Sequence, residues 1–318
     1  MLIQFEIADW INSHKGRYDL MQSGLIGRID LSKYFNGCGF EEPKQLKKLI
    51  AQINGTDEEL VSLTHGATEG VDLVAKALRL SGVNGFDSFL PEYEMLYKAP
   101  LAEGMERGKN VLFLSDPNNP TSLRAELPEG YRYYVIDETF LQFVADLDRV
   151  KRPVNSFRIN TFTKFYGGDE VRVGYIISPS SEIRETIERL QGITYEPVSK
   201  HNICIAKKIL EDNDRLKEEA RRISAENFET VERHMGELKF YMNRKPEATT
   251  VAFLDYSHYS SISSFELCER LYKKGISAIP AKMFGSDSTH IRVAYTRENT
   301  KDAMSELVSA LENLYKSS

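Results

Sequence analysis

The alternation of short apolar segments with helical ones between residues 60 and 178 constrains the fold of this chain more than any other feature. Strands are predicted at Leu60–Thr64, Phe86–Leu90, Val111–Ser115, Tyr133–Asp137, Ser156–Thr161 and Val173–Ser178. Several of these segments are apolar on both faces, which is typical of strands buried inside a largely parallel sheet. Helical periodicity appears before and between them, at Leu46–Asn54 and Val71–Leu80. The pattern therefore predicts an α/β fold.

The sequence after Pro179 predicts helices and then a smaller unit of mixed structure. Helical segments lie at 181–191, 199–212 and 214–238. The last third is predicted as an α+β unit with strands at Thr249–Asp255, Ile276–Pro280 and His290–Tyr295 and helices at Ser264–Lys274 and Asn299–Tyr315. Residues 5–14 favour a short amphipathic helix. We expect a large domain at 40–235 and a small domain that combines 1–39 with 236–318.

Composition and charge exclude several classes of function. The net charge is −6 with acidic and basic residues interleaved, which gives no sign of a surface for nucleic acid or for an anionic membrane. No apolar run reaches the roughly 18 residues that a membrane span needs. Cys38, Cys204 and Cys268 are widely spaced and form no paired metal-ligand pattern. These features favour a protein of the reducing cytoplasm without a metal site.

One lysine, Lys164, has neighbours that suit covalent chemistry. It follows the strand predicted at Ser156–Thr161, with hydroxyls at Thr161 and Thr163 and with Arg172 eight residues later. A lysine surrounded by phosphate-binding groups suits an amine that forms a Schiff base with a phosphate-bearing aldehyde. The alternative is a solvated loop lysine, which is the commoner case for any single lysine.

A glycine-flanked turn, Gly66-Ala-Thr-Glu-Gly70, joins the first predicted strand to a helix. The free amides and the dipole at the start of a helix bind phosphate, and a glycine lets the anion approach closely. The turn is therefore a candidate phosphate site. A plain strand-to-helix turn capped by the Thr68 hydroxyl is the alternative.

Two polar residues follow the next central strands. Asn119 lies after the strand Val111–Ser115 and before Pro120, which restricts the backbone and gives the carboxamide a set direction. Asp137 ends a buried strand, where a carboxylate needs a cation or hydrogen-bond donors. A phenolate oxygen would be a suitable partner for Asn119, and a protonated pyridine nitrogen would be a suitable partner for Asp137. Alternatively, Asn119 belongs to an ordinary polar turn. Asp137 alternatively caps the following turn or pairs with a structural arginine.

These groups follow one another along the chain as phosphate turn, asparagine, aspartate, lysine and arginine, and each is predicted at the carboxyl end of a strand. Ligands of open α/β sheets bind beyond the carboxyl ends of the strands. If every motif had its alternative, non-functional explanation, this order along the chain would be a coincidence. The arrangement favours one site for a phosphate-bearing aldehyde.

Seven short motifs carry a resemblance to a known family. They are Gly66-Ala-Thr-Glu-Gly70, Pro91-Glu-Tyr93, Asn118-Asn-Pro-Thr121, Asp137-Glu138, Thr161-Phe-Thr-Lys164, Arg172-Val-Gly174 and Ile291-Arg292. From Leu46 to the C-terminus the chain resembles the aspartate-aminotransferase superfamily of pyridoxal-phosphate enzymes (fold type I), near the branch with histidinol-phosphate aminotransferase and threonine-phosphate decarboxylase. The resemblance implies a mostly parallel seven-stranded sheet between helices, plus a smaller α+β C-terminal domain.

The resemblance also implies roles for individual residues. Lys164 would form the internal aldimine with pyridoxal 5′-phosphate, Asp137 would hold the pyridinium N–H, and Asn119 would bond the phenolic oxygen. Tyr93 matches the aromatic residue that stacks on the pyridine ring, and Arg292 matches the arginine that binds the substrate α-carboxylate. The phosphate would be held by Ala67, Thr68, Thr161, Thr163 and Arg172.

Two departures from the family concern the cofactor. Phe140 stands where relatives commonly have a tyrosine that bonds the phenolic oxygen, which leaves Asn119 alone and predicts a raised aldimine pKa. Relatives are mostly homodimers in which a tyrosine from the neighbouring subunit contacts the phosphate. Tyr34 lies in the right region for that contact, although its local spacing differs.

The resemblance implies a cytoplasmic, homodimeric aminotransferase that moves an amino group between an amino acid and a 2-oxo acid. Histidinol-phosphate aminotransferase and a decarboxylase like threonine-phosphate decarboxylase are alternatives, and a non-catalytic relative is a third. Relatives with phosphorylated substrates carry an additional arginine where this chain has Ile279. The segment Pro280–Gly285 resembles general amino-acid aminotransferases, whereas Thr163–Tyr166 resembles the decarboxylase. Lys282 and Arg297 are candidates to bind a second anion.

Overall fold

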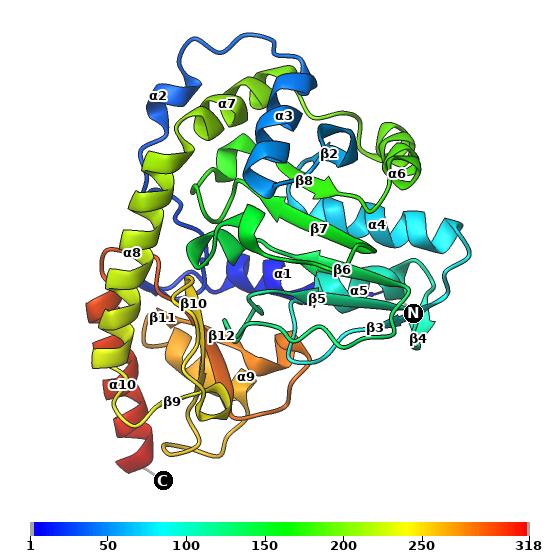
Figure 1. Ribbon diagram of the computed structural model, residues 1–318. Helices are drawn as coiled ribbons and strands as arrows, with labels where there is room; N and C mark the ends of the chain where they lie inside the picture. The colour runs from blue at the N-terminus through cyan, green and yellow to red at the C-terminus, as the bar shows by residue number, and fades with distance from the viewer. Residues whose placement is uncertain (1–2, 317–318) are drawn as a thin grey trace.

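The computed structural model describes residues 3–316, and its largest part is a seven-stranded sheet (Figure 1). Its strands run in the order β2 (Val61–Thr64), β8 (Gly174–Ile177), β7 (Ser156–Thr161), β6 (Tyr133–Asp137), β5 (Val111–Ser115), β3 (Gly85–Asp87) and β4 (Glu106–Arg107). β8 is antiparallel to both of its neighbours, and the other neighbouring pairs are parallel. The prediction of a mostly parallel seven-stranded sheet is confirmed.

Helices cover both faces of this sheet. The first face is covered by α4 (Ala67–Leu80), α5 (Met95–Ala102) and α6 (Ser181–Thr194), and the second by α3 (Pro43–Asn54), α7 (Lys200–Glu211) and α8 (Asn213–Arg233). Successive side chains of a strand point to opposite faces. In β8, Ile176 packs with the first group of helices, whereas Tyr175 and Ile177 pack with the second. Burial on both faces explains why these strands lack polar alternation.

A smaller antiparallel sheet forms the second unit, in the order β12 (Ile279–Pro280), β13 (His290–Ala294), β10 (Val251–Asp255) and β9 (Lys239–Phe240). The unit also holds α9 (Ser264–Tyr272) and α10 (Thr300–Lys316). The N-terminal segment joins it, because β1 (Tyr18–Asp19) pairs with β11 (Ile276–Ser277). Figure 1 shows α1 (Glu6–Ser13) between the two units and the long α8 running alongside both.

Several predicted boundaries are wrong, each for an identifiable reason. The helix predicted to start at Val71 begins at Ala67, so its first turn contains the glycine-flanked motif. The strand predicted at Ile276–Pro280 is divided at Ala278 into β11 and β12, which pair with different sheets. The helix predicted at 214–238 ends at Arg233, shortly before Gly236, which has φ +57°. The strand predicted at Phe86–Leu90 is only β3, which leaves the sheet after Asp87.

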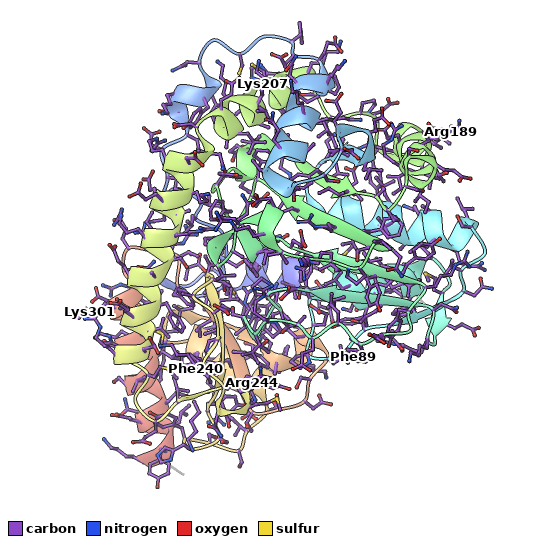
Figure 2. All side chains as sticks on the ribbon, in the orientation of Figure 1. Phe89, Arg189, Lys207, Phe240, Arg244 and Lys301 are labelled. Atoms are coloured by element: carbon purple, nitrogen blue, oxygen red, sulfur yellow. The ribbon has the colours of Figure 1, made fainter. Side chains whose placement is uncertain are left out.

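The described helices have polar outer faces. Figure 2 shows Arg189 on α6 and Lys301 on α10 pointing away from the sheets. Among residues 3–316, no helix combines the length and the apolar character that crossing a bilayer requires. Cys38, Cys204 and Cys268 are all free thiols.

Candidate active site

The central strands bring their polar ends to one edge of the large sheet. β5, β6 and β7 are parallel, and Ser115 lies opposite Asp137 in the register. β8 runs the other way, so its first residue, Gly174, lies beside both Thr161 at the end of β7 and Thr64 at the end of β2. The antiparallel strand thus begins where the parallel strands end. This topology brings a residue that precedes β8 to the same edge.

The start of α4 forms a concave backbone turn at this edge. Gly66 has φ +108°, a conformation that favours glycine, and the amides of Ala67 and Thr68 belong to the first helical turn, which has no intrahelical acceptors. A Cβ added to Gly66 would lie 3.5 Å from Arg172 Nη2 and 3.8 Å from Thr161 Oγ1. The N-cap position is occupied by Gly66 and Thr68 lies inside the helix, so the structure does not support a turn capped by the Thr68 hydroxyl.

Arg172 and two threonines surround this turn. Arg172 has φ +47°, uncommon for a residue with a side chain, and its Nη2 donates to the carbonyl of His65 at 3.1 Å. The hydroxyls of Thr161 and Thr163 are 3.1 Å apart. A guanidinium, two hydroxyls and two free amides therefore face one small space. This set of donors suits a phosphate group.

Lys164 lies in the same cleft, and its amine makes no hydrogen bond or ion pair within residues 3–316. Burial lowers the pKa of Lys164 to about 8. The positive charges of Arg292 and Arg172 lower this pKa further, while Asp169 and Asp137 oppose the change. A lysine amine with this pKa is substantially neutral near pH 8, as a nucleophile must be.

The lowered pKa of Lys164 predicts the pH dependence of cofactor attachment. Below pH 8 the amine is protonated and cannot attack an aldehyde, so attachment to the cofactor-free protein should accelerate as pH rises through about 8 and then level off. Borohydride trapping at timed intervals between pH 6 and 10 measures this rate. The same measurement with free N-acetyl-lysine corrects the rate for the pH dependence of the cofactor itself. A midpoint near 10, the pKa of an exposed lysine, would contradict the prediction.

Asp137 is buried at the end of β6 and has no cationic partner within residues 3–316. The arginines behind the sheet are engaged elsewhere, since Arg152 and Arg158 contact Glu138 at 2.7 and 2.9 Å. One oxygen of Asp137 accepts from the Thr139 amide at 2.9 Å, so it does cap the following turn. Burial raises the pKa of this carboxyl. An ionised Asp137 would therefore be stabilised by a cationic ligand.

The carboxamide of Asn119 is also left without a partner. Its Oδ1 is buried and accepts no hydrogen bond within residues 3–316, while its backbone amide donates to Ser115 Oγ at 2.8 Å. The backbone is therefore fixed and the side chain is free to bond a ligand. Buried polar groups are almost always bonded in proteins, so an unbonded one in a cleft suggests a ligand group.

Glu92 was not among the predicted site residues, yet its carboxyl group accepts hydrogen bonds from two segments of the site. Its Oε1 accepts from the Tyr93 amide at 2.7 Å and from the Ser115 hydroxyl. Its Oε2 accepts from the Ser115 amide at 2.8 Å and from Asn118 Nδ2 at 3.2 Å. Burial raises the pKa of Glu92 to about 8. The carboxyl group thereby connects Tyr93 to the loop that carries Asn119.

Replacing Glu92 with glutamine should weaken cofactor binding. Each carboxyl oxygen accepts from a backbone amide, so glutamine can satisfy only one of the two. An unsatisfied buried donor costs about 1–3 kcal/mol, which corresponds to a roughly five- to 150-fold weaker complex. Absorbance titration with pyridoxal phosphate measures the dissociation constant. Glu129→Gln, at an exposed position, is the matched control. Equal dissociation constants for Glu92→Gln and the control would refute this role.

Arg292 enters the cleft from β13 of the smaller unit. Its side chain is buried, because the residue is only 3% exposed. One Nη donates to the carbonyl of Met21, whereas Nε is buried and unbonded within residues 3–316. The nearby Asp19 pairs with Arg297 at 3.0 Å. Burial lowers the pKa of Arg292 to about 10. A buried guanidinium without a carboxylate partner is suited to an anionic ligand.

A cleft of about 810 Å³ unites all of these groups. All ten predicted site residues line it: Ala67, Thr68, Tyr93, Asn119, Asp137, Thr161, Thr163, Lys164, Arg172 and Arg292. Phe140 lines it too and places no hydroxyl there. Sequence reasoning missed the wall formed by α1 and by Met21, Gln22 and Ser23. The amphipathic pattern of residues 5–14 was the available signal, but it does not say which surface the helix covers.

Tyr34 lies outside this cleft, on the short helix α2 (Ser32–Phe35). Its hydroxyl donates to Asp212 Oδ2 at 2.5 Å and accepts from Arg215 Nη2 at 2.9 Å. The hydroxyl that was considered for a phosphate in a neighbouring subunit is therefore bonded within its own chain.

The arrangement fits pyridoxal phosphate group by group. The open space at Gly66 fits the phosphate. Among the described residues, Asn119 Oδ1 has no hydrogen-bond donor and the buried acid Asp137 has no cationic partner. The amine of Lys164, with its pKa lowered to about 8, is available to an aldehyde in its neutral form above that pH. Tyr93 is half-buried and offers a ring on the wall of the same cleft.

Comparison with known proteins agrees with this chemistry. The family model of aminotransferase class I and II matches residues 90–311. The chain is 27% identical to histidinol-phosphate aminotransferase 2 of Archaeoglobus fulgidus, over 93% of this chain and 91% of that protein. It is also 27% identical to a putative threonine-phosphate decarboxylase of Caldanaerobacter subterraneus subsp. tengcongensis, over 91% of this chain and 85% of that protein.

Solved structures with the same fold cover nearly the whole chain. A PLP-dependent aminotransferase from Streptococcus suis has a TM-score of 0.80 at 17% identity and covers 100% of this chain and 99% of its own. An Escherichia coli protein described with a methionine aminotransferase function has a TM-score of 0.78 at 16% identity, with coverage of 98% and 97%. These two likenesses concern the fold.

Proposed function

The chain belongs to the class I and II aminotransferases, which depend on pyridoxal phosphate, and we propose that its cleft transfers amino groups with Lys164 as the acid–base residue. One observation carries the proposal. Within residues 3–316, a lysine amine with a pKa of about 8, a buried carboxylate without a cationic partner and a buried guanidinium without a carboxylate partner line one cleft beside a helix start. Each of these three groups lacks the partner that the reaction would supply.

The first set of residues holds the cofactor. Ala67, Thr68, Thr161, Thr163 and Arg172 would bind its phosphate, Asn119 its phenolic oxygen and Asp137 its ring nitrogen. The bound cofactor supplies an electron sink for the substrate α-carbon. Asp137 supports that role because a buried carboxylate keeps the ring nitrogen protonated. Tyr93, held in place by Glu92, would lie against the ring.

The second set handles the amino acid. Arg292 would bind the α-carboxylate, since a guanidinium forms two parallel hydrogen bonds with a carboxylate. Lys164 would take the proton from the α-carbon and later return a proton to the other carbon of the reacting system. Its pKa near 8 suits both directions of that transfer.

Decarboxylation is the second candidate activity, because one relative is named as a putative threonine-phosphate decarboxylase. Both activities would use the same lysine and the same cofactor, so the products must separate them. The purified holoenzyme is mixed with single amino acids in the absence of a 2-oxo acid. Formation of the pyridoxamine form with one equivalent of 2-oxo acid supports aminotransfer. Release of carbon dioxide with the original absorbance restored identifies a decarboxylase, and no change with any amino acid refutes both.

We also propose that the protein works as a homodimer in the reducing cytoplasm. Tyr195 lines the cleft and is 41% exposed, and Ile193, two residues earlier on α6, is 82% exposed, which suggests that another surface covers this region. The three free cysteines favour a reducing compartment. Sedimentation equilibrium should give twice the chain mass of 36.3 kDa. A monomer with full activity would refute the dimer.

A further inference from the structure

Five residues of alternating charge form a continuous chain of ion pairs beside the cleft. In order they are Arg124, Asp116, Arg152, Glu138 and Arg158. The four successive N–O distances along this chain are 2.8, 2.8, 2.7 and 2.9 Å. Every carboxylate oxygen of the two acids contacts an arginine, which is the condition under which buried acids are tolerated. None of the five residues lines the cleft.

The two acids of this chain are next to the residues that would hold the cofactor ring. Asp116 lies three residues before Asn119, and Glu138 follows Asp137 directly. The backbone amide of Asp116 also donates to the carbonyl of Asp137 at 2.9 Å. A displacement of either acid would therefore move a side chain that faces the cofactor.

Arg152 joins the two acids to each other. Its Nη1 contacts Asp116 Oδ2 at 2.8 Å, and its Nε donates to Glu138 Oε1 at 2.7 Å. Among residues 3–316, no other cation contacts both carboxylates. The planar guanidinium holds its donors in a fixed arrangement, so the two contacts set the distance between the acids. These contacts are buried within one chain and do not depend on a partner subunit.

The distance between the two acids matters because Asn119 and Asp137 would bind different atoms of one rigid ring. Within residues 3–316, the Oδ1 atom of Asn119 accepts no hydrogen bond, and Asp137 accepts from the Thr139 amide alone. Groups inside the cleft therefore do little to fix these side chains. A misplacement of about 1 Å in a site can cost about 10²-fold in rate, so their spacing has to be set from outside the cleft.

We propose that Arg152 is a positioning residue for the cofactor ring, because it joins Asp116 to Glu138 and so fixes the spacing of Asn119 and Asp137. This inference rests on the proposed function and adds a residue to it. Arg152 acts through the two acids and touches neither the cofactor nor the substrate.

The affinities of three cofactor analogues test the proposal on the cofactor-free protein. The ligands are pyridoxal phosphate, 3-deoxypyridoxal phosphate, which lacks the phenolic oxygen, and 1-deazapyridoxal phosphate, in which carbon replaces the ring nitrogen. All three keep the aldehyde and the phosphate. Absorbance titration measures each dissociation constant for wild type and for Arg152→Lys, whose single ammonium keeps the charge but cannot reproduce the two fixed contacts.

We expect Arg152→Lys to weaken the binding of pyridoxal phosphate by about tenfold or more. The loss for each analogue should be at least threefold smaller, because a ligand that makes only one of the two ring contacts does not depend on the distance between them. A purely structural role would weaken all three ligands alike. A difference of less than threefold for either analogue overturns the proposal.

Arg221→Lys is the matched control. Arg221 also bridges two groups, the carbonyl of Gln142 at 2.8 Å and Asp146 at 3.0 Å, but it lies outside the cleft and the ion-pair chain. Its substitution removes comparable contacts and should weaken the three ligands equally or not at all. Selective loss of pyridoxal phosphate in this control would also overturn the proposal, because the effect would not be specific to Arg152.

A second variant keeps the test decisive if Arg152→Lys does not fold, which thermal unfolding establishes. Glu138→Gln retains the shape of the side chain, but its single oxygen cannot accept from both Arg152 and Arg158. We expect the same selective loss of pyridoxal phosphate, and equal losses for the three ligands overturn the proposal. Wild-type protein that binds none of the three ligands refutes the proposed function itself. Normal wild-type binding without a selective loss in the variants refutes only the role of Arg152.

Discussion

Replacing Lys164 with alanine is expected to lower turnover by about 10⁴-fold, the upper range for removal of a positioned general acid–base group. The variant should also bind pyridoxal phosphate without a covalent bond. Both effects follow from the position of the amine in the cleft and from its pKa of about 8, which makes the neutral amine far more abundant near pH 8 than for an exposed lysine. Half-reaction rates measure the first effect, and mass spectrometry of borohydride-treated peptides measures the second.

Two controls separate chemistry from structure. Lys282→Ala removes an exposed lysine and should keep wild-type rates. Added ethylamine should restore part of the Lys164→Ala activity and leave the control unchanged, because a free amine can replace a missing base but not a missing packing contact. Wild-type protein that carries the cofactor on a peptide without Lys164 would refute the assignment.

The polar edge of the sheet was predictable because its residues follow consecutive strands. Asn119, Asp137 and Lys164 each come after an apolar segment, and parallel strands end at a common edge. The glycine turn was recognisable since the helix start needs free amides and a residue without a side chain. Local patterns were sufficient for these positions, and the family resemblance added the roles.

The parts that sequence did not reveal depend on contacts distant in the chain. Arg172 reaches the site because β8 is antiparallel, whereas the pattern predicted every group at the carboxyl end of a strand. Glu92 acts through Ser115, 23 residues away, and Glu94 holds α1 across 88 residues. The division of Ile276–Pro280 arises because β1 pairs with β11. No local periodicity encodes such pairings.

The buried carboxyl group of Asp137 lowers the stability of the cofactor-free protein. Burial raises the pKa of its carboxyl, so in the cofactor-free protein its ionised form opposes folding. For an acid with a raised folded pKa, stability is highest below the unfolded pKa and falls as pH rises towards the folded value. Asparagine has the same shape and can still accept from the Thr139 amide. The cofactor-free Asp137→Asn variant should therefore be at least as stable as wild type at pH 8.

The same substitution should lower turnover by about 10²–10³-fold, the range for loss of a positioned electrostatic group. A neutral amide cannot keep the ring nitrogen protonated, so the electron sink weakens while Arg292 still binds the substrate carboxylate. The loss should consequently appear in kcat. KM should stay within about threefold of the wild-type value, since the substrate contacts made in the ground state are retained. Steady-state kinetics and thermal unfolding of the cofactor-free protein measure the two effects, with exposed Asp287→Asn as the control. A kcat within threefold of the control, or a lower unfolding temperature together with a raised KM, would show that Asp137 acts as a structural residue.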